Sequence, residues 1–189
     1  TARSRGLGDV YKRQPPAWLE RLSPSSHPRR NGQETDSPDV VFYTGCNMLK
    51  TPHIGLLCLD VLDRLDVRYE VHGGPQSCCG ILPMRTGDDA NAWRQGERTR
   101  ERFRQAGAEQ ILSWCPTCQM QFSETTAPGQ SPFNVTQPTL PDVAHTSVAM
   151  TMFPVYLASR LDALRPHLIH PVKRRVAFYE QPGTPGVMA

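Results

Sequence analysis

The sequence of 189 residues has no apolar run long enough for a membrane-spanning helix, which needs about 20 residues. Its longest apolar stretch, residues 147–161, is interrupted by Thr151 and Pro154. Nothing near the N-terminus resembles the apolar segment of a secretory signal. We therefore expect a cytoplasmic protein without a membrane span, and a sequence of this kind is still compatible with peripheral association with a membrane.

Common nucleotide-binding motifs are missing as well. The sequence contains neither a Walker phosphate-binding loop nor the Gly-x-Gly-x-x-Gly fingerprint of dinucleotide-binding folds. We therefore expect no nucleotide or flavin site in this chain, so that any flavin involved would belong to a partner protein. No motif supports Ser-His-Asp hydrolase chemistry, and we assign no catalytic residue.

The chain has little excess charge beyond its first residues. Residues 1–14 carry four basic side chains and one acidic side chain, a net charge of +3 that equals the net charge of the whole chain. Residues 15–189 therefore sum to zero, and we expect no nucleic-acid partner. Residues 1–14 lack hydrophobic periodicity, and DNA encoding residues 9–14 would match the end of a common sequencing adaptor. We expect this segment to be a remnant of sequencing or assembly.

Prolines cluster in two parts of the chain, before residue 39 and between residues 128 and 141. We interpret residues 1–38 as a disordered or surface lead-in because residues 15–38 are rich in Pro, Ser and Arg. Residues 39–43, 67–71 and 110–114, by contrast, have the compositions and alternation of short buried strands.

Helical patterns separate these predicted strands. Apolar residues recur at spacings of three and four after Pro52, a polar helix opens at Asp88 and reaches about Gly107, and Pro116 marks the first turn of another helix. We interpret the late arginines of the polar helix as a solvated face. The alternation predicts an α/β fold with a small, mostly parallel sheet and flanking helices.

Five of the six cysteines follow the three predicted strands. Cys46 comes after the first strand, Cys78 and Cys79 come after the second, and Cys115 and Cys118 come after the third. The carboxyl ends of parallel strands meet at one edge of a sheet, where ligands commonly bind. The cysteine-bearing loops should therefore bring five thiols together at that edge.

Several chemistries could use such a cluster of thiols. A disulfide framework is disfavoured because there is no export signal and because the adjacent Cys78 and Cys79 cannot easily bridge each other. The Cys115-Pro-Thr-Cys118 turn resembles that of thioredoxins, which leaves a thiol–disulfide oxidoreductase open. Zinc takes four ligands and would leave one cysteine unused, so an iron–sulfur cluster is favoured over a structural zinc module without redox role.

Three other side chains that could take part in metal chemistry are not assigned to the site. Cys58 lies on the apolar face of the helix that follows Pro52, so we interpret it as a core residue. We interpret His53 and His72 as ordinary loop side chains.

The cysteine pattern resembles that of the cysteine-rich CCG domain family. The spacing from Cys46 to Cys118 is C-x31-CC-x35-C-x2-C. The short segments around the cysteines that also match are FYTGC at 42–46, CCG at 78–80 and CPTC at 115–118. This family includes a component of heterodisulfide reductase and related components of lactate, glycolate and glycerol-3-phosphate oxidising systems.

The resemblance implies a metal site and a redox role. A [4Fe–4S] cluster, cubane or non-cubane, would be held by Cys46, Cys78, Cys79, Cys115 and Cys118, although some sites in the family hold zinc. The residues beside these ligands that we expect to support the cluster are Gly45, Gly80, Pro116 and Thr117. The chain would then be an electron-transfer subunit or domain of an oxidoreductase, with a redox partner subunit of the flavin or ferredoxin type.

The resemblance also suggests how the chain is divided. We assign residues 39–166 to one CCG iron–sulfur domain. Many members of the family carry two copies of the motif, and residues 175–183 resemble the strand that would open a second copy. The corresponding cysteine would fall near Gly183, so we expect residues 167–189 to be the start of a truncated second half.

Overall fold

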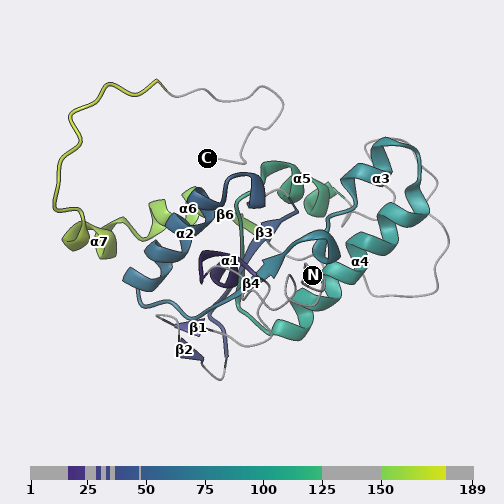
Figure 1. Cartoon of the computed structure of the whole chain (residues 1–189), viewed down its shortest axis with the longest axis horizontal. Coiled ribbons are helices and arrows are strands. Elements are labelled where there is room, and N and C mark those ends of the chain that lie inside the picture. The colour runs from purple at the N-terminus through teal and green to yellow at the C-terminus, as the bar shows by residue number, and fades with distance from the viewer. Residues whose placement is uncertain are drawn as a thin grey trace, which may run out of the picture.

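The computed structural model describes residues 17–23, 29–30, 33–34, 37–46, 48–124 and 150–177. Within these residues one six-stranded sheet has the order β2-β1-β4-β3-β5-β6 (Figure 1). Its strands are β1 (Arg29–Arg30), β2 (Gln33–Glu34), β3 (Val40–Gly45), β4 (Tyr69–Gly73), β5 (Gln110–Ser113) and β6 (Met150–Met152).

Four neighbouring strands of the sheet run parallel. Strand β3 lies between β4 and β5, and β5 in turn pairs with β6, all in parallel register. The two-residue strands β1 and β2 add an antiparallel extension beside β4. The prediction of an α/β fold with a mostly parallel sheet is therefore confirmed, and so are its three central strands.

Helices join and cover these strands. They are α1 (Ala17–Leu22), α2 (Pro52–Arg64), α3 (Ile81–Arg85), α4 (Asp89–Ala106), α5 (Pro116–Glu124), α6 (Phe153–Ser159) and α7 (Leu161–Leu164), with the short 3-10 helices η2 (Met48–Lys50), η3 (Pro75–Ser77) and η4 (Arg165–His167). Helix α4 begins where its Asp88 cap accepts a 3.2 Å hydrogen bond from the Asn91 N–H. It ends at Gly107, whose φ of 64° stops the helix. The three helices predicted from the sequence correspond to α2, α4 and α5.

Strands β3, β4 and β5 are covered on both faces, with α2 and α6 on one side and α3 and α4 on the other (Figure 1). Val40 and Phe42 of β3 pack in the core that includes α2 and α6. Val41 and Tyr43, which point the other way, pack in the core that includes α4 and α5. All six residues of β3 are therefore buried, which explains why this strand reads as a continuous apolar run.

The lead-in contains a helix that the sequence pattern did not predict. The expectation of an irregular segment is wrong for α1, because Leu22 is buried in the core beside α2 and Arg21 pairs with Asp60 and Asp63 of that helix. Tertiary packing stabilises this short helix, since six residues cannot form a stable helix alone. Residues 1–14, expected to be a sequencing remnant, lie outside the described residues.

Leu22→Ala should test whether α1 belongs to the folded domain. The Leu22 side chain is 4% exposed, so its truncation should lower the free energy of unfolding by about 2–3 kcal/mol. Trp18→Ala, on the same helix at a position that is 42% exposed, is the matched control and should have a smaller effect. Urea unfolding followed by circular dichroism measures both. Equal and negligible losses would show that α1 does not contribute to the fold.

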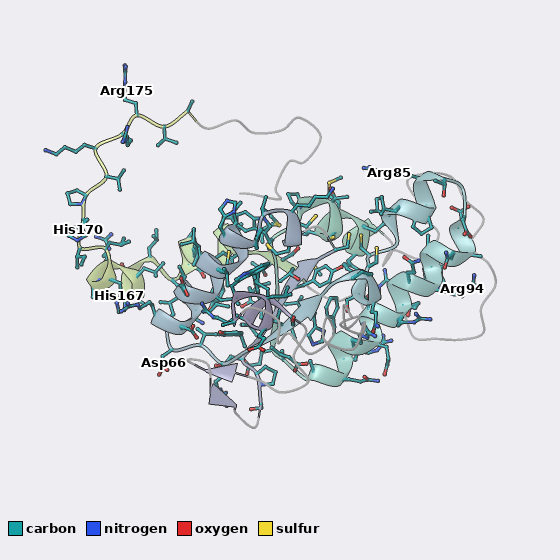
Figure 2. The ribbon with its side chains drawn as sticks, viewed as in Figure 1. Asp66, Arg85, Arg94, His167, His170 and Arg175 are labelled. Atoms are coloured by element: carbon teal, nitrogen blue, oxygen red, sulfur yellow. The ribbon has the colours of Figure 1, made fainter. Side chains whose placement is uncertain are left out.

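The described C-terminal residues extend away from the sheet. Residues 168–177 form no helix or strand, and the segment that carries His167, His170 and Arg175 runs outward (Figure 2). Of residues 175–183, which were expected to open a second copy, the structure describes only residues 175–177. No described helix combines the length and apolar character that crossing a membrane would require.

Candidate metal centre

The five cysteines of the motif lie at the carboxyl end of the parallel strands, as predicted. Cys46 follows β3 and is exposed. Cys78 and Cys79 follow β4 and η3 and are buried. Cys115 lies half-buried just before α5, and Cys118 is buried in the first turn of that helix. The site is therefore buried on its sheet side and reaches solvent through Cys46 and Cys115.

Four of these thiols interact directly with one another. Hydrogen bonds from Cys118 and Cys78 lower the pKa of the Cys79 thiol to about 3. A hydrogen bond from Cys118 lowers the pKa of Cys115 to about 6. The pKa of Cys78 is raised by its hydrogen bond with Cys79 and by burial, and that of Cys118 is raised by its hydrogen bonds with Cys115 and Cys79. These four thiols are therefore coupled, and the negative charge that the group carries is shared among them through their hydrogen bonds.

The β3 loop approaches the same group of thiols. Cys46 interacts electrostatically with Cys78. Gly45 brings the backbone close to the third loop, because a Cβ atom at this position would lie 3.4 Å from Cys118 Sγ and 3.9 Å from Cys115 Cβ. All three cysteine loops thus meet at one place.

Backbone N–H groups face the sulfur atoms. The Gly80 N–H donates a 3.4 Å hydrogen bond to Cys78 Sγ. At the start of α5, the backbone N–H groups of Thr117 and Cys118 contribute to the lowered pKa of Cys115 by hydrogen bonding to its sulfur. Pro116 and Thr117 themselves are exposed. N–H donors and a helix N-terminus stabilise negative charge, which suits thiolates or a thiolate-bound cluster.

Helix α4 holds the loop that carries the adjacent cysteines. The Thr99 hydroxyl donates a 2.9 Å hydrogen bond to the carbonyl of Cys78. Arg102 Nη1 donates to the Gln76 carbonyl and to Ser77 Oγ, both at 2.7 Å. Gly96 lies under the same loop, because a Cβ there would be 3.5 Å from the Cys79 carbonyl. The backbone of residues 76–79 is therefore fixed along one side by α4.

The arginines of α4 do not form a uniformly solvated face. Arg94 is exposed at the outer part of the helix (Figure 2). Arg100, in contrast, is 4% exposed, pairs with Glu97 and lies 5.4 Å from the centre of the Phe122 ring. The prediction that the late arginines form a solvated face is therefore wrong for Arg100, which is buried, and for Arg102, which binds the loop before the adjacent cysteines. The sequence did contain a sign of this packing. Gly96, Thr99 and Phe103 are spaced by three and four residues, which places uncharged residues on one face of the helix and indicates that this face is buried.

Strand β3 contributes a residue that the motif did not reveal. The buried hydroxyl of Tyr43 donates a 2.7 Å hydrogen bond to the carbonyl of Ser77, the residue before the two adjacent cysteines. Burial raises the pKa of Tyr43 well above its usual value, and the neighbouring thiols Cys118, Cys79 and Cys78 raise it further. The Tyr43 hydroxyl therefore lies next to the group of thiols.

Two predictions about other polar residues have different outcomes. Cys58 of α2 is 4% exposed in the core, where burial raises its pKa to about 12, so its interpretation as a core residue is confirmed. His72 is not a loop side chain but a buried residue of β4. Its Nε2 atom lies 2.7 Å from Glu70 Oε1, and its ring stacks on Phe103. His53 is exposed.

The donor set suits a metal centre that prefers soft ligands. Thiolates bind zinc and iron–sulfur clusters well, and the N–H donors around Cys78 and Cys115 favour the charged form of the sulfurs. The described residues contain no group of three or more His, Cys, Asp or Glu side chains already set around one metal ion. The thiols are thus gathered at one edge of the sheet without forming the closed ligand set of a single ion.

A comparison with protein families identifies the segment that contains this site. The model of the CCG family, described as a cysteine-rich domain, matches residues 40–123. The matched segment runs from β3 into α5 and includes all five cysteines of the motif, but it ends well before residue 166. A search of curated proteins and a search of solved structures gave no match. Residues 40–123 therefore match the CCG family of cysteine-rich domains, the family that the cysteine spacing resembles.

Proposed function

We propose that this domain binds an iron–sulfur cluster and serves in electron transfer within an oxidoreductase, in the manner of heterodisulfide reductase-like proteins. The observation that carries the proposal is the meeting of three cysteine loops at one sheet edge inside the CCG segment. The proposed ligands are Cys46, Cys78, Cys79, Cys115 and Cys118, and the proposed cofactor is a [4Fe–4S] cluster of cubane or non-cubane type.

The number and surroundings of the thiols support a cluster over a structural zinc ion. A zinc ion takes four ligands in a tetrahedron, whereas a cluster with several iron atoms can use five thiolates, including an adjacent pair. Hydrogen bonds from N–H groups to ligand sulfurs stabilise the negative charge of a cluster and influence its potential. Gly80 supplies such a donor to Cys78, and the first turn of α5 supplies others to Cys115.

The bound cluster would supply a redox centre that accepts and returns electrons. The chain's own residues would hold it at the sheet edge, exclude water on the inner side through the buried Cys79 and Cys118, and leave Cys46 and Cys115 toward solvent. Electrons would therefore enter and leave on the side of Cys46 and Cys115. We propose that a redox partner subunit of the flavin or ferredoxin type docks there.

One observation favours a second function, thiol–disulfide exchange by Cys115 and Cys118. The lowered pKa of Cys115, about 6, and its half-buried position before α5 are typical of an attacking thiol. This function would leave the other three thiols at the site without a role, so we rank it second.

Anaerobic purification followed by metal and sulfide analysis tests the proposal. We expect several iron atoms per chain, acid-labile sulfide and a brown protein whose absorption bleaches on reduction with dithionite. One zinc ion in a colourless protein would instead establish a structural zinc module. A metal-free protein that reduces disulfides, and loses this activity on Cys115→Ser, would establish the thiol–disulfide function.

A further inference from the structure

We infer that Tyr43 is a positioning residue for the adjacent cysteines, because its hydroxyl links β3 to the loop before Cys78 and Cys79 and to the Cys118 thiol. This inference deepens the proposed cluster site and rests on that proposal for the role of the cysteines. It concerns the hydrogen bonds by which the protein holds the cysteine loops in position.

The surroundings of Tyr43 allow its side chain little freedom. It is 0% exposed, and its ring packs edge-on against Phe103 of α4 and Phe122 of α5, with ring centres 5.2 Å and 5.8 Å apart. Because helices on both flanks fix the ring, the hydroxyl is held at one point of the site. A hydroxyl fixed in this way can determine where its partners lie.

The partners of the hydroxyl belong to the other two cysteine loops. It donates to the Ser77 carbonyl at 2.7 Å, and it has a hydrogen-bonding contact with the Cys118 thiol of α5. Tyr43 is itself on β3, three residues before Cys46. One phenol therefore connects the three segments that supply the five thiols.

The Ser77 carbonyl depends on the Tyr43 hydroxyl for its hydrogen bond, whereas neighbouring polar groups of the loop are held by donors from α4. Ser77 is 2% exposed, so water cannot readily replace a lost hydrogen bond. Arg102 holds the same loop, but its hydrogen bonds go to the Gln76 carbonyl and to Ser77 Oγ. Thr99 likewise holds the Cys78 carbonyl. Without the Tyr43 hydroxyl, α4 would still hold one side of the loop while the side facing β3 would be released.

Tyr43→Phe removes this oxygen and keeps the ring. In the reduced, metal-free full chain, we measure the rate at which iodoacetamide labels each cysteine, with peptide mass spectrometry. The buried Cys58 reports opening of the core on the other side of the sheet. The summed labelling rate of Cys78 and Cys79, divided by that of Cys58, should rise about fivefold, the effect of one lost hydrogen bond on a local opening equilibrium.

Tyr69→Phe is the matched control. Tyr69 is 2% exposed on β4 in the core that contains Cys58, and its hydroxyl interacts with Arg21 and Asp63 rather than with thiols. Its removal should leave the labelling ratio unchanged or lower it. If Tyr43→Phe and Tyr69→Phe change the ratio equally, Tyr43 has only a general packing role and the inference is overturned.

Anaerobic reconstitution with iron and sulfide gives a second readout. Tyr43→Phe should change the electron paramagnetic resonance spectrum of the reduced protein and speed iron release to a chelator, whereas Tyr69→Phe should do neither. A spectrum and release rate identical to those of the wild type would also overturn the inference. If the wild type takes up no iron, the proposed function fails, and the labelling ratio still decides the role of Tyr43.

Discussion

Cys79→Ser is expected to abolish or rearrange the iron–sulfur cluster and to destabilise the protein purified with its metal. Cys79 is 3% exposed and accepts hydrogen bonds from both Cys118 and Cys78, so it lies at the centre of the thiol group. Serine is a poor ligand for iron, and the loops that the cluster would tie together would lose that link. Because metal-binding energy contributes to folding energy, the melting temperature should fall together with the iron content.

Cys58→Ala is the internal control for this experiment. It also removes one buried sulfur, but from α2, whose apolar face packs in the core on the other side of the sheet. We expect full iron content, an unchanged absorption spectrum and a loss of about 1 kcal/mol in the free energy of unfolding. Both proteins are prepared in parallel, so losses during purification affect them alike.

The comparison has two outcomes that would contradict the assignment. Equal iron loss in both variants would show that Cys58 is not merely a core residue. Unchanged iron and spectrum in Cys79→Ser would remove one member of the adjacent pair from the site. Four cysteines would then remain, and a zinc site would become the better interpretation.

The central sheet and the gathering of the cysteines could be predicted because each depends on local sequence. Strand β3 is buried on both faces and therefore shows an uninterrupted apolar pattern. Once β3, β4 and β5 are parallel, the positions of Cys46, Cys78 and Cys115 after their ends follow from topology alone. No side-chain detail was needed for that step.

The supports of the site could not be predicted in the same way. Thr99 and Arg102 act on a loop more than 20 residues away in sequence, and only the packing of α4 brings them there. Tyr43 looked like one more apolar strand residue, because nothing in a period-2 pattern shows what a buried hydroxyl contacts. Helix α1 and strand β6 were missed for a related reason. Both are short, and both are stabilised by neighbours rather than by their own propensity.

Gly80→Ala should cause a large loss of stability, because an added methyl group at this position meets both backbone strain and a close contact. Gly80 has φ of 87°, where any other residue is strained by about 1–2 kcal/mol. An added Cβ would also lie 2.3 Å from the carbonyl oxygen of Ala92. That oxygen belongs to the backbone of α4 and cannot move aside as a flexible side chain could. We therefore expect a total loss of more than about 3 kcal/mol in the free energy of unfolding.

Gly87→Ala separates the two causes of this loss. Gly87 has a similar φ of 80°, but a Cβ there would meet no atom within 4 Å, so only the backbone strain remains. Urea unfolding of the two metal-free variants gives the difference, which measures the contact between the cysteine loop and α4. The clash should also displace the Gly80 N–H from Cys78 Sγ, so Gly80→Ala should lower iron content while Gly87→Ala keeps it. Equal stabilities and equal iron contents would mean that the loop does not depend on its close approach to Ala92, and that α4 does not hold the adjacent cysteines in place.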